Sequence, residues 1–194
     1  MQSNDRSYKI LLYKSTLSFA GGLPDGLSVV TSPLSCLSEA TEGHYNLIVV
    51  FLDYRSLRER DALVDLCSKL NNNRYTMHIP LIAVLPSRHR KLLERLQDAG
   101  VKYVKFYDQR NLNSKSGLET FVVSPTEECR IDRALSNICP YITYFPINRH
   151  QEILYCGAYR NRLVLGPYRL SNYCETANYK TCQYVNDPKF LKNV

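Results

Sequence analysis

Four cysteines in the last third of the chain have the residue type and number that metal chemistry requires. Sixteen, seventeen and seven residues separate them, in the order Cys139, Cys156, Cys174 and Cys182. Four soft thiolates can complete a tetrahedral Zn²⁺ site or hold an iron–sulfur cluster. The chain lacks the C-x2-C pairs of zinc ribbons, and cluster ligands can be scattered. We therefore expect an iron–sulfur cluster, [4Fe–4S] favoured; Zn²⁺, disulfides or redox thiols, and ordinary buried cysteines are the alternatives.

Little else in the sequence indicates catalysis. Cys129 is a spare thiol, and His150, six residues before Cys156, could replace a ligand or activate a thiol. The alternative for His150 is an exposed position in a loop. Neither a glycine-rich phosphate loop nor a G-x-S-x-G motif occurs in the chain. We therefore expect a protein that is not an enzyme.

Apolar runs alternate with helical patterns over the first hundred residues. Continuous apolar runs predict strands that are covered on both faces, as in parallel sheets. We expect five strands, at residues 9–13, 27–30, 45–52, 80–85 and 103–106. Helices are expected over residues 61–70 and 88–99, the second capped by Ser87 and followed by Gly100. This alternation predicts a doubly wound α/β fold.

The order of these elements resembles the response-regulator receiver family. The matching segments are Lys9-Ile10-Leu11, Asn46–Val50, Ile79–Ile82 and Ala99-Gly100-Val101, and the resemblance covers about residues 7–107. It implies a flavodoxin-like, five-stranded parallel sheet. It also implies a phosphorylation pocket that contains an acidic pair, an acceptor aspartate, a Ser/Thr and a lysine.

The residues at these pocket positions do not fit phosphoryl transfer. Lys14-Ser15 replaces the acidic pair, Phe51 the acceptor and Leu85 the Ser/Thr, while Lys105 matches the lysine if a two-residue gap is allowed. Mg²⁺ needs carboxylate ligands, and phenylalanine offers no oxygen nucleophile, so we predict that phosphorylation is lost. A shifted pocket that uses Asp53 is the alternative. Without the pocket, the resemblance implies an interaction module.

These patterns divide the chain into three parts. Residues 1–108 are expected to form the receiver-like domain, residues 109–138 a linker with a helix over 125–138, and residues 139–194 a small cysteine-rich domain. The last part resembles an uncharacterised bacterial cysteine module with Cys-Pro-Tyr near its start, Cys-Gly-Ala-Tyr in the middle and Tyr-Cys-x7-Cys-x-Tyr at its end. This resemblance implies no particular activity.

The charge distribution bears on the partner. The net charge is +7, and nine Lys/Arg against four Asp/Glu give +5 from Cys129 to Val194. A basic surface suits an acidic partner. A protein partner is our expectation. Nucleic acid is an alternative, because tyrosines beside arginines, as in Tyr159–Arg162, could stack on bases and neutralise phosphates. A homodimer is also left open, and the basic helix Arg88–Arg95 is either a contact face or a solvated surface.

The compartment is inferred from what the sequence lacks. No apolar run approaches the roughly 18 residues that span a bilayer, and the polar start does not resemble a signal peptide. We expect a cytoplasmic protein without membrane contact, in which thiols stay reduced. Cys36 and Cys67 lie in apolar surroundings and are expected to be buried.

The leading hypothesis is a non-enzymatic regulatory or sensor protein. It couples a phosphorylation-independent receiver-like module to a four-cysteine metal site. The alternatives are a nucleic-acid-binding protein with a zinc-stabilised basic tail and a thiol redox protein.

Overall fold

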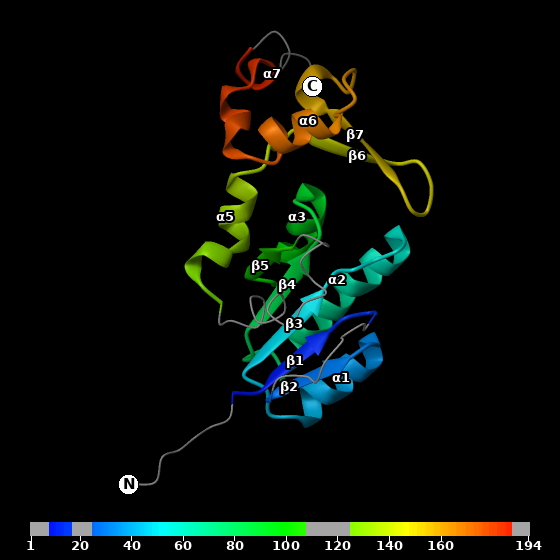
Figure 1. Cartoon of the computed structure of the whole chain (residues 1–194), viewed down its shortest axis with the longest axis vertical. Coiled ribbons are helices and arrows are strands. Elements are labelled where there is room, and N and C mark those ends of the chain that lie inside the picture. The colour runs from blue at the N-terminus through cyan, green and yellow to red at the C-terminus, as the bar shows by residue number, and fades with distance from the viewer. Residues whose placement is uncertain (1–7, 17–24, 108–124, 188–194) are drawn as a thin grey trace.

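The centre of the molecule is a five-stranded, all-parallel sheet with the strand order β2-β1-β3-β4-β5 (Figure 1). The computed structural model describes residues 8–16, 25–107 and 125–187. The strands are β1 (Ile10–Tyr13), β2 (Leu27–Val30), β3 (Leu47–Phe51), β4 (Leu81–Leu85) and β5 (Tyr103–Phe106). This order is that of flavodoxin-like folds. The five expected strands and the parallel sheet are confirmed.

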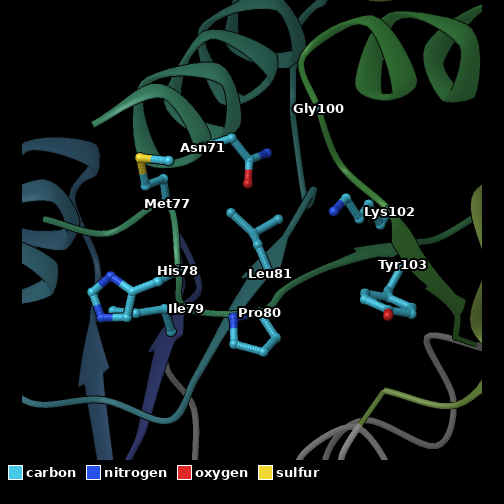
Figure 2. A pocket seen from close by; sticks show the side chains of 9 residues that line it. All are labelled: Asn71, Met77, His78, Ile79, Pro80, Leu81, Gly100, Lys102 and Tyr103. Atoms are coloured by element: carbon cyan, nitrogen blue, oxygen red, sulfur yellow. The ribbon is translucent and has the colours of Figure 1, made fainter. Parts of the chain in front are cut away.

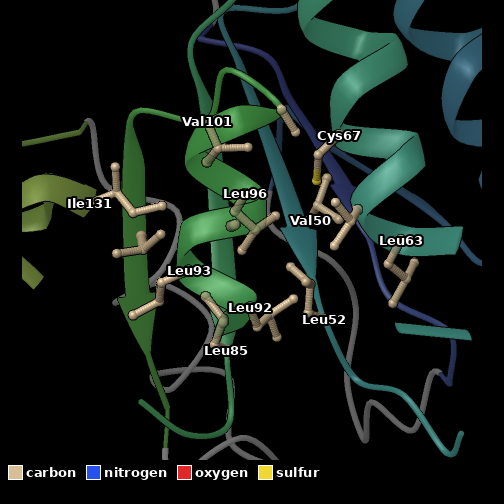
Figure 3. Close-up of a cluster of buried hydrophobic side chains, with 14 of the residues drawn as sticks. Val50, Leu52, Leu63, Cys67, Leu85, Leu92, Leu93, Leu96, Val101 and Ile131 are labelled. Atoms are coloured by element: carbon tan, nitrogen blue, oxygen red, sulfur yellow. The ribbon is translucent and has the colours of Figure 1, made fainter. Parts of the chain in front are cut away.

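Three helices cover one face of this sheet. They are α1 (Pro33–Glu42), α2 (Leu57–Asn72) and α3 (Arg90–Asp98). Strand residues such as Val50 and Leu85 share one buried cluster with Leu63, Cys67 and Leu96 of the helices (Figure 3). Cys36 of α1 is also in this cluster, so both of the cysteines expected to be buried are buried.

Along each strand, the alternate residues whose side chains point to the other face of the sheet form a second buried cluster. Its described members belong to the strands, except for Tyr107, which follows β5. Among residues 8–16, 25–107 and 125–187, no helical residue belongs to this cluster. The doubly wound arrangement, which requires helices on both faces, therefore stays a prediction.

Capping groups explain where the helices begin. The Ser32 side chain accepts the Ser35 N–H at 3.0 Å, so α1 begins at a Ser-Pro step that the sequence analysis did not use. The cap expected for α3 at Ser87 is wrong. His89 takes this place, because its Nδ1 accepts the Leu92 N–H at 3.1 Å.

The end of α3 is as expected. Gly100 follows the helix with a φ of 84°, a conformation that favours glycine. In contrast, α2 is longer than the expected 61–70, because Ser56 caps it by accepting the Glu59 N–H at 3.2 Å.

The chain from residue 125 to 187, called the C-terminal segment below, has little regular structure. The helix expected over 125–138 is a 3₁₀ turn, η2 (Glu127–Cys129), followed by the short α5 (Ile131–Ser136). An antiparallel hairpin of β6 (Ile142–Pro146) and β7 (Glu152–Cys156) comes next. Short helical turns complete the segment: η3 (Gly157–Tyr159), α6 (Pro167–Arg169), η4 (Leu170–Cys174), η5 (Ala177–Thr181) and α7 (Gln183–Asn186).

The C-terminal segment packs on the end of the molecule where α2 and α3 begin (Figure 1). The buried cluster of the helical face continues into it through Ile131, Leu135 and Ile142. At the tip of the hairpin, the Leu57 N–H donates to the Arg149 carbonyl at 2.8 Å. The first hundred residues and the C-terminal segment therefore share one core.

A buried ion network fixes this packing. Glu152 of β7 accepts hydrogen bonds from Arg60 of α2 at 2.6 and 3.2 Å, and its oxygen lies 2.9 Å from His89 Nε2. The three side chains are 9 to 11% exposed. The Tyr144 ring stacks on His89 with the centroids 3.8 Å apart, and its hydroxyl accepts the Arg90 N–H at 2.9 Å.

The hydrogen bonds of His89 define its tautomer. Its Nδ1 accepts a backbone N–H, so in the neutral ring the proton sits on Nε2 and is donated to Glu152. Burial lowers the pKa of His89, and Glu152 opposes this shift only in part. The neutral form is therefore the one that fits the folded protein.

The first residues of the basic segment 88–95 contact the C-terminal segment of the same chain. The Arg90 side chain donates to the Ile138 and Leu135 carbonyls at 2.6 and 3.2 Å. Arg88 donates to the Glu175 carbonyl at 3.2 Å. The start of the basic segment is thus covered by the C-terminal segment.

No helix of the described ranges is long and apolar enough to cross a bilayer.

Replacing Glu152 with glutamine should destabilise the protein strongly. The change leaves the Arg60 charge buried without its counter-ion, which costs about 3 kcal/mol of the free energy of unfolding. Glu94→Gln is the matched control: it breaks the more exposed pair of Glu94 with Arg90 and should cost about 0.5 kcal/mol or less. Urea unfolding curves measure both. Equal losses for the two variants would contradict a structural role of the network.

Acidification below about pH 6.5 should also destabilise the fold, because the unfolded histidine titrates near that value. The folded pKa of His89 is lowered, so the unfolded chain takes up the proton first and stability present above pH 6.5 is lost as the pH falls. The slope cannot exceed about 1.4 kcal/mol per pH unit. Burial raises the pKa of Glu152, but its hydrogen bonds to Arg60 and His89 outweigh this effect and lower the pKa. Titration of Glu152 therefore affects stability only near pH 4 and below.

The measurement is the free energy of unfolding at pH 7.5 and pH 5.5, in the wild type and in His89→Asn. Asparagine can cap α3 but does not titrate. The difference between the two pH values should shrink in the variant. An unchanged difference would assign the effect to another group.

Candidate metal centre

The fold gathers the four tail cysteines. Cys139 follows α5, Cys156 ends β7, Cys174 ends η4 and Cys182 precedes α7. The first three are 5 to 9% exposed and Cys182 is half-buried; all are free thiols. Each pair lies close enough for ionisation of one thiol to raise the pKa of the other: Cys139 is affected by Cys156 and Cys182, Cys156 by Cys182, and Cys174 by the other three. Four residues that are scattered along the chain thus lie in one region.

Backbone contacts explain how three of the cysteines meet. The Cys139 N–H donates to the Cys174 carbonyl at 2.7 Å, which joins the start of the hairpin to the end of η4. The hairpin register places Cys156 opposite Ile142, three residues after Cys139. The hairpin therefore turns a separation of sixteen residues into a cross-strand neighbourhood.

An aromatic pair brings in the fourth cysteine. The rings of Tyr159 and Tyr184 lie 4.9 Å apart, which holds η3 against α7 and so places Cys182 near Cys156. The Arg169 guanidinium lies over the Tyr184 ring, 5.2 Å from its centroid. Such cation–π contacts add to the packing. Tyr159 and Tyr184 therefore belong to the packing that surrounds the thiols.

Two of the thiols have backbone hydrogen bonds that favour the thiolate. The Tyr141 backbone interacts in this way with Cys139, and the Ala158 and Tyr159 backbones with Cys156. Burial has the larger effect and raises the pKa of both thiols. Amide donors close to a sulfur lower the energy of the anionic form, which is the form that binds metal.

Burial and the proximity of the other thiols raise the pKa of Cys139, Cys156 and Cys174, so these three favour the neutral form. Burial, followed by the charges of the other three cysteines, raises the pKa of Cys174 to about 12. Arg169 acts in the opposite direction on Cys174 and Cys156, and Arg90 does so on Cys139. A bound cation would act in the same direction as these arginines, so metal binding and loss of the thiol protons would be coupled.

The arrangement is wider than a site for a single ion. Among the described residues, no three His, Cys, Asp or Glu side chains converge closely enough to hold one metal ion. Zinc–sulfur bonds of about 2.3 Å would place tetrahedral sulfurs about 3.8 Å apart. The four thiols thus share one region, but the described residues do not form a close set of ligands around one point.

The two other residues considered as ligands make contacts elsewhere. His150 is exposed at the tip of the hairpin, where its Nδ1 lies 2.7 Å from the Arg55 carbonyl oxygen. Cys129 is half-buried in η2, with its sulfur 3.4 Å from the Thr126 hydroxyl. The contacts of both residues are with groups outside the set of four thiols.

The pocket positions of the receiver resemblance hold apolar and cationic side chains. Phe51 is fully buried at the end of β3, and its ring lies 5.7 Å from that of Tyr107. The Lys14 ammonium lies over the Phe51 ring at 5.8 Å. Leu85 is fully buried. Asp53 is half-buried, and its backbone carbonyl accepts a hydrogen bond from Ser15 at 3.2 Å.

A hollow of about 200 Å³ at the opposite ends of β4 and β5 has no comparable chemistry (Figure 2). Its described lining contains three ionisable side chains, those of His78, Lys102 and Tyr103, beside apolar residues such as Ile79 and Leu81. Neither a nucleophile nor a set of metal ligands lines it, so the tail cysteines remain the candidate site.

No family model matches the chain, and a search of the curated proteins finds no significant match. The resemblances to receiver domains and to a four-cysteine module therefore remain predictions.

The sequence analysis missed the arginines of the site. Arg169 ends the short α6, which the sequence analysis did not predict, and Arg90 belongs to a helix that the sequence analysis did not connect with the cysteines. Only the packing of α3 against α5 brings Arg90 to Cys139. The available signal was Tyr168-Arg169, a further tyrosine beside an arginine in the cysteine-rich part of the chain.

The protein should take up no phosphoryl group from acetyl phosphate and Mg²⁺, because Lys14, Phe51 and Leu85 occupy the pocket positions. Incorporation of radiolabelled phosphate measures this, and Asp53→Asn should give the same background as the wild type. Label that acid–base stability assigns to an acyl phosphate, and that Asp53→Asn removes, would establish the shifted pocket instead.

Proposed function

We propose that the chain is a non-enzymatic regulatory or sensor protein in which a cysteine-rich C-terminal domain binds an iron–sulfur cluster. A receiver-like module without phosphorylation chemistry carries this domain. The observation that supports the proposal best is the proximity of the four tail cysteines, which backbone pairing and one aromatic contact bring into one region. Unrelated buried cysteines have no reason to meet in a segment with so little regular structure.

The scatter of the thiols along the chain favours a cluster over a single zinc ion. Zinc ribbons use C-x2-C pairs, which the chain lacks. A cubane cluster contributes several irons, each of which takes one protein thiolate. [4Fe–4S] is the cluster type that uses one cysteine for each of four irons.

The surroundings suit a buried anionic centre. Four thiolates carry four negative charges, of which a cluster core neutralises only a part. Arg169 and Arg90 supply positive charge next to the thiols. Backbone amides near Cys139 and Cys156 supply hydrogen bonds, and both features adjust the reduction potential of such centres.

The regulatory part of the proposal follows from the packing. Cys139 lies three residues after the end of α5, which contacts the start of α3, and Cys174 directly precedes Glu175, which contacts Arg88. Loss or oxidation of a cluster would first weaken these two contacts. The surface formed by α3 and the C-terminal segment would change, and a protein partner that binds this surface could sense the change.

A zinc-stabilised protein that binds nucleic acid is the second candidate. The exposed tyrosines Tyr168 and Tyr173, 72 and 38% exposed, lie in the basic C-terminal segment and could stack on bases. Binding of this kind would weaken steeply with salt. A thiol redox protein is the third candidate, with Cys182 as the least buried of the four tail thiols.

Anaerobic purification should yield a brown protein with about four iron and four sulfide ions per chain. Cys174→Ser removes one of the four ligands and should lose most of the iron and the visible absorption. Cys129→Ser changes a half-buried thiol outside the set and is the matched control; it should keep both. Iron, zinc and sulfide analysis with visible and EPR spectra provides the readout, and circular dichroism checks the fold of each variant.

A colourless protein with one zinc, lost in Cys174→Ser but kept in Cys129→Ser, would overturn the cluster in favour of the second candidate. A chain that folds and binds neither metal under reconstitution would overturn the metal proposal altogether.

A further inference from the structure

We propose that the outer face of the hairpin formed by β6 and β7 is a docking surface for an acidic amphipathic helix of a partner protein. Five apolar side chains make up this surface, which will be called the outer hairpin face. Its members are Phe145, Ile147, Ile153, Tyr155 and Val164. All five lie in the described part of the chain, and the docking does not depend on a metal at the cysteines.

A third, very short segment widens the hairpin. Val164 forms an antiparallel bridge with Tyr155. Backbone hydrogen bonds of 2.9 and 2.8 Å on either side of this bridge join residues 163–165 to β7. These residues lie along the edge of β7 that β6 does not use, so the three segments form one small layer.

Alternation along the three segments separates an inner face from an outer one. On the inner face, Cys156 and Leu165 belong to the buried cluster that continues from α2 and α3. The members of the outer hairpin face belong to neither buried cluster, and Phe145, Ile147 and Val164 are 46, 62 and 51% exposed. An apolar sheet face is normally buried against another element, and an exposed one marks a contact site.

The side chains of the outer hairpin face form one continuous surface. Phe145 is paired with Ile153 across the hairpin, and Tyr155 is paired with Val164 in the next segment. The rings of Phe145 and Tyr155 lie 5.4 Å apart in an edge-to-face arrangement, which joins the two rows. Ile147 extends the surface toward the tip of the hairpin, which lies at the periphery of the molecule (Figure 1).

The charges at the two ends of this face are positive. Residues 141–165 contain three arginines, all exposed, and one carboxylate. The carboxylate is Glu152, which is held on the inner face in the buried ion network. Arg149 lies at the tip of the hairpin, and Arg160 and Arg162 lie in the turn at the opposite end. The outer hairpin face therefore suits a partner with acidic residues beside its apolar surface.

The same charges disfavour a second copy of the chain as the occupant. In a two-fold dimer one surface contacts itself, so the arginines of one copy would meet those of the other. Nucleic acid also suits a basic surface, but its bases stack on aromatic rings, and three of the five members are aliphatic. An acidic protein surface satisfies the charge and the apolar composition together.

The width of the face suits a helix. Three strands at a spacing of about 4.8 Å span about 10 Å, which is also about the diameter of an α-helix. Helices cover one face of the main sheet of this protein in the same way. A helix with an apolar stripe between acidic residues would complete the layer. The contact is small and therefore belongs to the transient class.

The outer hairpin face and one candidate metal ligand share a strand. Tyr155 points outward from β7, whereas the next residue, Cys156, is buried on the inner side. A helix docked on this face would thus be in a position to respond to the state of the cysteines. This consequence rests on the proposed function, whereas the docking itself does not.

The test uses the isotope-labelled full chain and two designed helical peptides with the same leucine stripe. Glutamates flank the stripe in one peptide, and lysines flank it in the other. The acidic peptide should cause saturable amide shifts at residues 143–147, 153–155 and 163–165, with an affinity that falls as salt is raised. The basic peptide should bind about tenfold more weakly or less. Single-stranded DNA and anionic lipid vesicles are the probes for other anionic partners.

Phe145→Ser and Arg162→Glu should each weaken binding of the acidic peptide by about fivefold or more. Arg162→Glu should also strengthen binding of the basic peptide, which a folding defect would not do. Leu34→Ser is the control for lost apolar surface, because Leu34 is 77% exposed on α1. Arg74→Glu is the control for reversed charge at an exposed arginine after α2. Both controls should bind as the wild type does.

Equal weakening by the control variants, or no saturable shift with the acidic peptide, would overturn the proposal. Tighter binding of the DNA or the vesicles at the same residues would assign the face to another class of partner. Concentration-dependent shifts at these residues without any probe would assign it to a second copy. The readout does not involve the cysteines, so each of these results leaves the metal site to its own test.

Discussion

The ion network of Arg60, His89 and Glu152 is the constraint on which the rest of the structure depends. Burying three such groups carries a desolvation cost, so their value lies in geometry more than in net stability. The hydrogen bonds of these three side chains fix the orientation of β7 against the starts of α2 and α3. Cys156 lies four residues after Glu152 on the same strand, so the network also determines where Cys156 lies.

The shared core explains how an irregular segment of modest length can be ordered. Short helical turns and one hairpin bury too little surface to fold independently. The cluster that begins under α2 and α3 extends through Ile131 and Ile142 to Cys156, so the sheet supplies the missing apolar contacts. A metal at the cysteines would thus add to a framework that the core already defines in part.

The sequence predicts the sheet well, because buried parallel strands such as Leu47–Phe51 are continuous apolar runs whose meaning depends little on their neighbours. It predicts α1 poorly: only Cys36 and Ala40 are buried there, too narrow a stripe to recognise, although Ser32 before a proline was a usable start signal. The four cysteines could be selected as candidates from type and number. Their mutual approach, and the pairing of Arg60 with a carboxylate 92 residues later, depend on tertiary packing that no local pattern encodes.

That long separation bears on how the protein is made. During synthesis, the sheet and its helices leave the ribosome well before β7, and in that interval Arg60 and the start of α3 are without Glu152 and Tyr144. Domains normally mature in the order in which they emerge. Here the earlier part can reach its final form only after the last third has arrived, so a nascent chain that stalls in between would offer a half-finished surface to chaperones and proteases.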